Sequence, residues 1–252
     1  MTRSRVELVA EVSSNHGGDI SLAKEFIYRF AEAGADWIKF QMTRVTHLRP
    51  SDPQYAWFQR AELSDDALMQ LAETCSDLGV KFLCTINHAD EAATLRSFSP
   101  FVKIGAGESR EKSLRDAVMA QNFQRIYVSN PPEGFWRVNK LDSSRAQRMK
   151  WNFTKVYPLT TVSRYPCPTF AADVHIGHYG WSDHCVGIEG AQLAIVKGAR
   201  MIEKHVQLPF QARPAKPFEA TLEEWRALRA FADDDPSRFI GRWQHVAQEV
   251  LA

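Results

Sequence analysis

Short apolar runs alternate along this chain with longer segments whose apolar residues recur every three or four positions. A run such as residues 36–41 has the length and composition of a buried strand, whereas the positions from Leu22 to Ala31 have the spacing of one helix face. The same alternation continues along most of the sequence. It predicts eight strands, at residues 6–12, 36–41, 80–85, 101–105, 125–129, 153–161, 180–182 and 199–204.

Capping residues mark where the predicted helices begin. Asp19 or Ser21 is a candidate cap for the first helix, and Ser64 and Thr221 begin two later ones. Other helices are predicted at residues 89–98, 111–121 and 188–198, with an exposed helix within the loop at 130–150 and a short one at 170–176. Residues 43–63, which are rich in proline and aromatic residues, are predicted to be a long loop.

Eight strand–helix units in 252 residues have the size and rhythm of a single-domain (βα)8 barrel spanning residues 1–252. A doubly wound open sheet also fits the alternation. The barrel is favoured because polar residues end nearly every predicted strand, and the carboxyl ends of barrel strands meet at one pocket. These polar strand ends are Glu11, Lys39, Gln41, Thr85, Lys103, Ser129, Ser182, His184 and His205.

Composition limits the classes of partner. The net charge of +1 gives no electrostatic reason to expect nucleic acid or a membrane surface. No apolar run reaches the roughly 20 residues of a membrane span. The four cysteines have no CxxC spacing, and the start of the sequence lacks the pattern of a signal peptide. We therefore expect reduced, buried thiols in a cytoplasmic protein.

Two histidines end consecutive predicted strands. His184 follows Ser182 with the period of two that puts both side chains on one face, and His205 follows Glu203 in the same way. Two imidazoles at one rim of a barrel suit a divalent metal ion with open positions for a substrate oxygen. The alternative is that each histidine is a hydrogen-bonded residue of the core or rim. Cys185 faces away from His184 and is expected to be a packing residue.

Two lysines lie in apolar strands, and an isolated buried ammonium group is costly. Lys39 and Lys103 therefore either bind an anionic ligand, such as a phosphate or a carboxylate, or pair with a structural glutamate, for example Glu11, Glu108 or Glu203. Backbone N–H groups of residues 105–107 (Gly-Ala-Gly) are further candidates for the anion. Glu11, at the end of the first strand, is a candidate base or orienting group, although a lone glutamate is more often a salt-bridge partner.

The motifs that carry these residues occur in an order that resembles the N-acetylneuraminate (sialic acid) synthase family, which includes legionaminic and pseudaminic acid synthases. The resemblance covers most of the chain. It rests on Ala10-Glu11-Val12 with Asn15-His16, Ala33-Gly34-Ala35-Asp36 with Ile38-Lys39-Phe40-Gln41, Cys84-Thr85, Lys103-Ile104-Gly105-Ala106-Gly107-Glu108, Tyr165-Pro166-Cys167-Pro168, Trp181-Ser182-Asp183-His184 and Ile202-Glu203-Lys204-His205.

The resemblance implies a (βα)8 barrel that condenses phosphoenolpyruvate with an aldehyde sugar of the N-acetylmannosamine type, with release of phosphate. It implies a divalent metal, Mn²⁺ or Mg²⁺, on His184 and His205. It also implies catalytic roles for Glu11, Gln41 and Glu108. The residues that it assigns to phosphoenolpyruvate are Lys39, Thr85, Lys103, Ser129, Tyr165 and Ser182.

Three departures from the family pattern concern the sugar end of the pocket. The small antifreeze-like domain that follows the family's barrel has no counterpart in this sequence, so a homodimer is expected to use another interface. Residues 213–219 lack the acidic residue at the position where the family carries it. Members of the family often have Asn and Ser at the positions of Ser163 and Ala106, and a Ser-Thr-Gly loop at the position of Ser129-Asn130-Pro131. We expect the metal and phosphoenolpyruvate sites to be intact and the sugar site to differ.

Two other functions fit the same residues. One is a different barrel lyase or aldolase that uses the lysines on another phosphorylated or keto-acid substrate. The other is a catalytically silent barrel that binds a ligand or partner. The combination of two histidines, two lysines and Glu11 argues against a silent barrel, since no structural requirement explains it.

Overall fold

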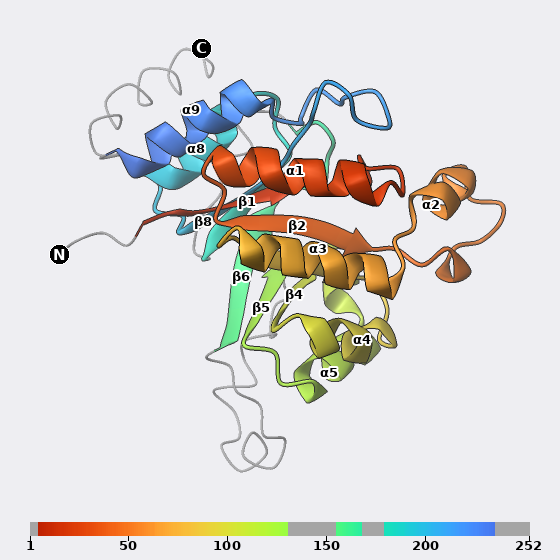
Figure 1. Cartoon of the computed structure of the whole chain (residues 1–252). Coiled ribbons are helices and arrows are strands. Elements are labelled where there is room, and N and C mark those ends of the chain that lie inside the picture. The colour runs from red at the N-terminus through yellow and green to blue at the C-terminus, as the bar shows by residue number, and fades with distance from the viewer. Residues whose placement is uncertain (1–4, 131–154, 168–178, 235–252) are drawn as a thin grey trace, which may run out of the picture.

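The structure, a computed structural model, describes residues 5–130, 155–167 and 179–234, and these contain a closed barrel of eight parallel strands (Figure 1). The strands follow one another around the barrel in chain order. They are β1 (Glu7–Glu11), β2 (Trp37–Met42), β3 (Lys81–Ile86), β4 (Phe101–Ile104), β5 (Arg125–Ser129), β6 (Val156–Thr161), β7 (Gly180–Asp183) and β8 (Met201–His205).

The pairing of β1 closes the barrel. Glu11 lies opposite Lys39 of β2 on one side and opposite His205 of β8 on the other. Because all strands are parallel, their carboxyl ends share one rim. The predicted barrel is confirmed, and the open sheet is excluded.

Helices pack around the strands, and their caps agree with the sequence in most places. Asp19, rather than Ser21, caps α1 by accepting hydrogen bonds from the N–H groups of Ser21 and Leu22. Ser64 caps α3, and Thr221 forms a capping box at α9. The α-helices are α1 (Ile20–Glu32), α2 (Tyr55–Ala61), α3 (Asp65–Asp77), α4 (Glu91–Phe98), α5 (Lys112–Ala120), α8 (Glu189–Val196) and α9 (Leu222–Asp233).

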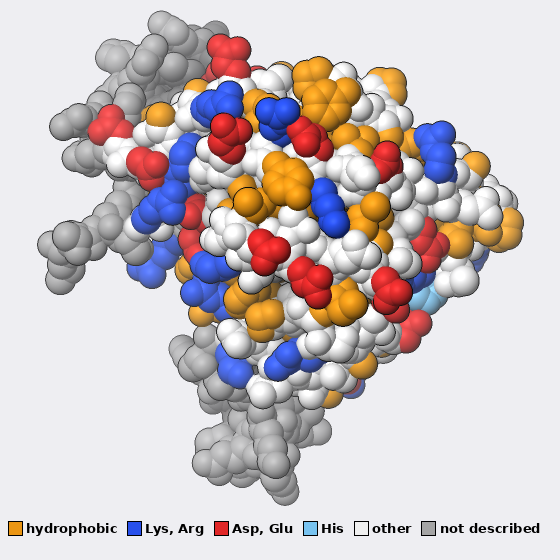
Figure 2. Space-filling model, viewed as in Figure 1, with side chains coloured by type: hydrophobic (Ala, Val, Ile, Leu, Met, Phe, Trp, Pro, Cys, Tyr) orange, Lys and Arg blue, Asp and Glu red, His pale blue; other side chains and the backbone are white. Residues whose placement is uncertain are grey.

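Two apolar layers hold these elements together. One lies between strands and helices, where Phe30 of α1 packs edge-on against Trp225 of α9. The other fills the amino-terminal half of the barrel interior with inward-facing side chains, which are Val9, Trp37, Leu83, Tyr127, Leu159 and Met201. Because these six side chains fill the amino-terminal half, the carboxyl rim is the open end of the barrel. On the outer face that carries α1 and α3, acidic and basic side chains are interspersed (Figure 2).

The prediction of one long loop at residues 43–63 was wrong. This segment contains a 3-10 turn, η1 (Val45–His47), and the helix α2. The helix has only seven residues and no side-chain cap, so its sequence carries little helical signal. A tertiary hydrogen bond stabilises it, since Trp57 Nε1 donates to Ser14 Oγ over 3.0 Å. Within the helix, the Arg60 guanidinium lies 4.6 Å from the centroid of the Trp57 ring.

Several predictions are left untested. The helices predicted at 130–150 and 170–176 fall mostly outside the described residues. The assignment of residues 1–252 to one domain also stays a prediction. Among the described helices, none combines the length and apolar character that crossing a membrane requires.

Candidate active site

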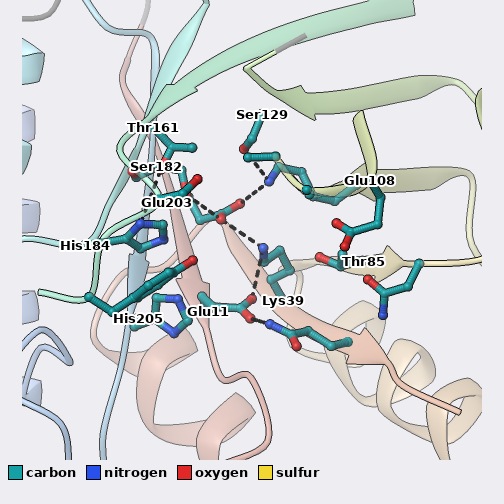
Figure 3. A pocket seen from close by; sticks show the side chains of 18 residues that line it. Glu11, Lys39, Thr85, Glu108, Ser129, Thr161, Ser182, His184, Glu203 and His205 are labelled. Atoms are coloured by element: carbon teal, nitrogen blue, oxygen red, sulfur yellow. Dashed lines mark hydrogen bonds and ion pairs between the residues drawn. The ribbon is translucent and has the colours of Figure 1, made fainter. Parts of the chain in front are cut away.

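One pocket of about 350 Å³ opens at the carboxyl rim of the barrel (Figure 3). Every residue that the sequence predicted to be catalytic, substrate-binding or metal-binding lines it, although these residues come from seven strands and from the segments that follow β4, β6 and β7. These residues are Glu11, Lys39, Gln41, Thr85, Lys103, Glu108, Ser129, Tyr165, Ser182, His184 and His205. The structure therefore confirms their convergence, while their individual roles stay predictions.

Lys39 lies between two buried glutamates (Figure 3). Its Nζ is 3.2 Å from Glu11 Oε2 and 2.9 Å from Glu203 Oε1. Burial alone would lower the pKa of Lys39, but the two carboxylates raise it above its ordinary value. Gln41 Nε2 donates to Glu11 Oε1 over 2.6 Å. Burial nevertheless raises the pKa of Glu11, and repulsion from Glu203 adds to that effect.

Lys103 is held more loosely. Its Nζ donates to Ser129 Oγ over 2.8 Å and lies 3.5 Å from Glu203 Oε2. Burial lowers the pKa of Lys103 to about 8 because Glu203, which Lys39 also contacts, only partly offsets the loss of water. Burial would raise the pKa of Glu203, but Lys103 and Lys39 bring it well below its usual range. Ser182 Oγ donates to the same carboxylate over 2.7 Å.

The two histidines lie side by side across the pocket from Thr85 and Glu108, with ring centroids 5.5 Å apart (Figure 3). His184 Nδ1 lies 2.8 Å from the Val162 carbonyl oxygen. A carbonyl only accepts, so Nδ1 is the protonated nitrogen and Nε2 keeps its lone pair. His205 Nδ1 is buried without a hydrogen-bond partner in the described chain. Burial lowers the pKa of both histidines, and for His205 repulsion from His184 adds to it.

Tyr165 covers the histidines at the mouth of the pocket. Its ring centroid is 4.0 Å from that of His184 and 6.2 Å from that of His205. The residue is 55% exposed, so it forms part of the pocket wall and part of the surface. Burial of the hydroxyl raises the pKa of Tyr165 to about 12. The phenol therefore stays protonated and can donate a hydrogen bond to a ligand.

A second group near His184 also offers metal-ligand atoms. Atoms of Cys167, Asp183 and Cys185 lie within 4.8 Å of one another, so these residues could hold a metal ion. Asp183 Oδ2, however, accepts a 2.6 Å hydrogen bond from the buried ammonium group of Lys204, and Oδ1 accepts from Trp181 Nε1. The two sulfur atoms are 2.7 Å apart. The Lys204 charge already balances Asp183, so the histidine pair is the better-suited metal site.

Sequence reasoning treated Glu203 only as a potential lysine partner, whereas it is the central carboxylate of the pocket. Its position two residues before His205 was the available signal, because both side chains then face the barrel interior. Asn87 and Thr161 were missed. Thr161 ends β6, and its Oγ1 donates to the Ser182 carbonyl over 2.8 Å and lies 3.3 Å from His184 Nδ1.

The Asn15-His16 motif does not line the pocket. Asn15 instead connects the loop after β1 with the segment after β8. Asn15 Nδ2 donates to the Val206 carbonyl, and Asn15 Oδ1 accepts from Arg213 Nε. Arg213 also lies 3.2 Å from Glu219. Burial lowers the pKa of His16 to about 4, so the ring is neutral at physiological pH. Residues 213–219, which lack the acidic residue that the family carries at this position, are thus held against the loop after β1.

A closed parallel barrel with two lysines, two neutral histidines and three carboxylates at its carboxyl rim has the architecture of a (βα)8-barrel enzyme. Comparison with known proteins defines the family. The NeuB family model matches residues 26–229, and the chain belongs to this family.

Characterised relatives and solved structures agree with this assignment. The chain is 28% identical to N,N'-diacetyllegionaminic acid synthase of Legionella pneumophila, over 79% of this chain and 63% of that protein. It is 25% identical to N-acetylneuraminate-9-phosphate synthase of Drosophila melanogaster, over 81% and 60%. It thus spans less than two thirds of either relative. The crystal structure of a sialic acid synthetase from Leptospira borgpetersenii shares the fold, with a TM-score of 0.75, 23% identity, and coverage of 91% and 83%.

Proposed function

We propose that this barrel condenses phosphoenolpyruvate with an aldehyde sugar resembling N-acetylmannosamine, giving a 2-keto sugar acid of the sialic acid type and inorganic phosphate. The observation that carries the proposal is the presence of two lysines and two neutral histidines in one pocket. Family membership and the synthase relatives support it. The two substrates are the small-molecule partners of the proposal.

The lysine end of the pocket suits phosphoenolpyruvate. Lys39 and Lys103 offer two ammonium groups, and Ser129 and Ser182 offer hydroxyl groups close to them. Thr85 Oγ1 is buried and lacks a hydrogen-bond partner within the described residues. Leaving such a group unsatisfied costs about 1–3 kcal/mol, and a ligand oxygen would remove that cost. The carboxylate and phosphate of the substrate are acceptors of the required kind.

The histidine end suits a divalent metal, which we infer to be Mn²⁺ or Mg²⁺. His184 Nε2 has its lone pair available because Nδ1 donates to a backbone carbonyl, the arrangement common in metal-binding histidines. His205 Nδ1 is a buried nitrogen without a hydrogen-bond partner among the described residues. When bound there, the metal supplies Lewis-acid polarisation of the sugar aldehyde.

The carboxylates provide the proton transfers. Carbon 3 of phosphoenolpyruvate forms the new bond to the aldehyde carbon, and the aldehyde oxygen takes up a proton. We assign this proton to Glu11, whose pKa is raised by burial and whose carboxyl group Gln41 orients. Water adds at carbon 2 and gives one proton to Glu108. The hydroxyl group left on carbon 2 then passes its proton to the phosphate as the C–O bond breaks, which forms the 2-keto group and releases phosphate. Gly105 makes room for Glu108, since a Cβ there would lie 2.6 Å from Glu108 Oε2.

The test is phosphate release. The protein is incubated with phosphoenolpyruvate, Mn²⁺ and a panel of aldoses that includes N-acylated mannosamines. Released phosphate is then quantified, and the masses of the products are measured by mass spectrometry. We expect phosphate only when an aldose is present, together with a product whose mass equals aldose plus phosphoenolpyruvate plus water minus phosphoric acid. Absence of phosphate with every aldose would contradict the proposal.

One observation keeps an aldolase as a second candidate. The amine of Lys103 has a pKa lowered to about 8, so part of it is neutral and able to form an imine with a keto acid. Borohydride reduction in the presence of pyruvate separates the two functions. An aldolase would gain covalent mass on Lys103, whereas the proposed synthase forms no imine.

Location and assembly complete the proposal. None of the four cysteines forms a disulfide, which fits the cytoplasm. A homodimer is inferred from the family resemblance, and light scattering on purified protein tests it.

A further inference from the structure

Another group of histidine and acidic side chains lies outside the pocket, in the segments that follow β2 and β3. His47 ends the turn η1, and His88 and Asp90 precede α4. The ring centroids of the two histidines are 3.8 Å apart. The proposed condensation uses none of these residues.

The His47 ring has a carboxylate on each side. Nε2 lies 3.2 Å from Asp90 Oδ2, and Nδ1 lies 3.5 Å from Glu91 Oε1. Glu91 is only 4% exposed, and its other oxygen accepts the backbone N–H groups of Asn87 (2.7 Å) and His88 (3.0 Å). These two bonds fix the carboxylate so that Oε1 faces His47.

Two atoms of this group face each other without a hydrogen bond between them. Glu91 Oε1 and His47 Nδ1 are both buried, and neither makes a hydrogen bond within the part of the chain that the structure describes. Buried polar atoms without partners are uncommon in folded proteins and call for an explanation. These two atoms lie opposite each other in a 3.5 Å ion-pair contact, and the contact between His47 and Asp90 involves neither of them.

A metal ion on His47 Nε2 would keep the ring proton on Nδ1, where it faces Glu91 Oε1. Histidine ligands of metals commonly present their second ring nitrogen to a carboxylate, which orients the ring and increases its basicity. Glu91 stands in that position. We propose that His47, His88 and Asp90 bind a divalent transition metal of the Zn²⁺ type, and that Glu91 orients His47. Because His88 and Asp90 are exposed, their side chains can turn toward the ion.

The ligand set distinguishes this site from the one proposed in the pocket. Two imidazoles and one carboxylate suit Zn²⁺, Co²⁺ or Ni²⁺ better than Mg²⁺. The site also borders the pocket, because Asn87, which precedes His88, lines it. A bound ion would therefore join the loops after β2 and β3 at the rim.

The experiment counts Co²⁺ and Zn²⁺ ions bound to the full chain, by calorimetry and by the visible spectrum of Co²⁺. His88→Ala and Asp90→Asn remove exposed ligands and should leave the fold intact. Glu73→Gln, on an exposed position of α3, is the matched control, and His184→Ala removes the pocket's proposed ligand. We expect His88→Ala and Asp90→Asn each to bind one metal ion fewer per chain at this site. Wild type, Glu73→Gln and His184→Ala should retain that ion.

A finer variant tests the orienting role. Glu91→Gln should still bind this metal ion, but with an affinity about 10- to 100-fold lower, as when the carboxylate partner of a metal ligand is removed in other proteins. Equal stoichiometry and affinity in wild type, His88→Ala and Asp90→Asn would overturn the proposal and reduce the group to surface ion pairs. Since phosphate release is not the readout, failure here leaves the proposed synthase activity unaffected.

Discussion

Both ends of the barrel hold a buried or half-buried glutamate of β1, but the surroundings of the two carboxylates differ. At the amino end, Glu7 accepts hydrogen bonds from Trp37 Nε1, Lys81, Arg125 and Tyr179. Burial would raise the pKa of Glu7, but Lys81 and Arg125 bring it below its ordinary value. Both of its oxygens have partners, which is the arrangement expected of a structural group.

At the carboxyl end, several polar atoms are buried without a hydrogen-bond partner among the described residues. They are Glu11 Oε2, Thr85 Oγ1, Glu203 Oε2 and His205 Nδ1. The two glutamate oxygens have ion-pair contacts with Lys39 and Lys103 instead. The contrast indicates that the amino end is complete by itself, whereas the carboxyl end is arranged for ligands.

The strongest test of this contrast removes a proposed metal ligand. His184→Ala should lower phosphate release by at least about 100-fold, because loss of a ligand exceeds the 10- to 100-fold effect of its supporting residues. It should also abolish Mn²⁺ binding in the pocket, measured by the electron paramagnetic resonance signal of free Mn²⁺. Unchanged Mn²⁺ binding would show that the histidine is not a ligand.

The next test is the pH dependence that Lys103 imposes. Its pKa of about 8 means that its charge disappears as pH rises through that value. Above it, kcat/KM for phosphoenolpyruvate should fall about tenfold per pH unit, since this ratio reports groups of the free enzyme. Lys103→Arg, which stays charged, should remove this decline. A flat profile from pH 7 to about 9.5 in wild type would speak against the assignment of Lys103 to the anion.

The sign of the accompanying stability change follows from proton counting. Between about pH 8 and the ordinary lysine pKa near 10.4, the unfolded chain keeps a proton on Lys103 that the folded protein has lost. The contribution of Lys103 to the free energy of unfolding therefore rises with pH across this window. Below pH 8 both states are protonated, and the contribution is constant.

At the amino end we expect stability to change without activity. Glu7→Gln removes the carboxylate that Lys81, Arg125 and Tyr179 share, and it should lower the free energy of unfolding by about 1–3 kcal/mol. Partial exposure of the two cations favours the lower part of this range. Urea unfolding measures the effect. If kcat/KM falls instead while stability is unchanged, the two ends do not differ as described.

The smallest expected effect concerns Thr161. Thr161→Val removes the hydroxyl that donates to the Ser182 carbonyl and lies near His184 Nδ1. If the hydroxyl helps to orient the His184 ring, its removal should reduce the free energy of Mn²⁺ binding by about 1 kcal/mol, which is a several-fold weaker affinity. Thr161→Ser should restore most of the affinity. Equal affinities for all three proteins would limit Thr161 to a packing role.

The strands could be predicted from sequence because apolar runs and the period of two determine which side chains face the barrel interior. Lys39, His184 and His205 were placed correctly for this reason. The contacts of Glu203 with both lysines depend on how the barrel closes, and no local pattern records that. The proximity of His47 to His88 was invisible for the same reason, since two separate loops bring them together.

The most direct test is a crystal structure of the protein with Mn²⁺ and phosphoenolpyruvate. The account predicts an anomalous Mn²⁺ peak between His184 and His205, with the phosphate and carboxylate of phosphoenolpyruvate on Lys39 and Lys103. Mn²⁺ bound away from both histidines, or phosphoenolpyruvate bound outside the carboxyl end of the barrel, would contradict it.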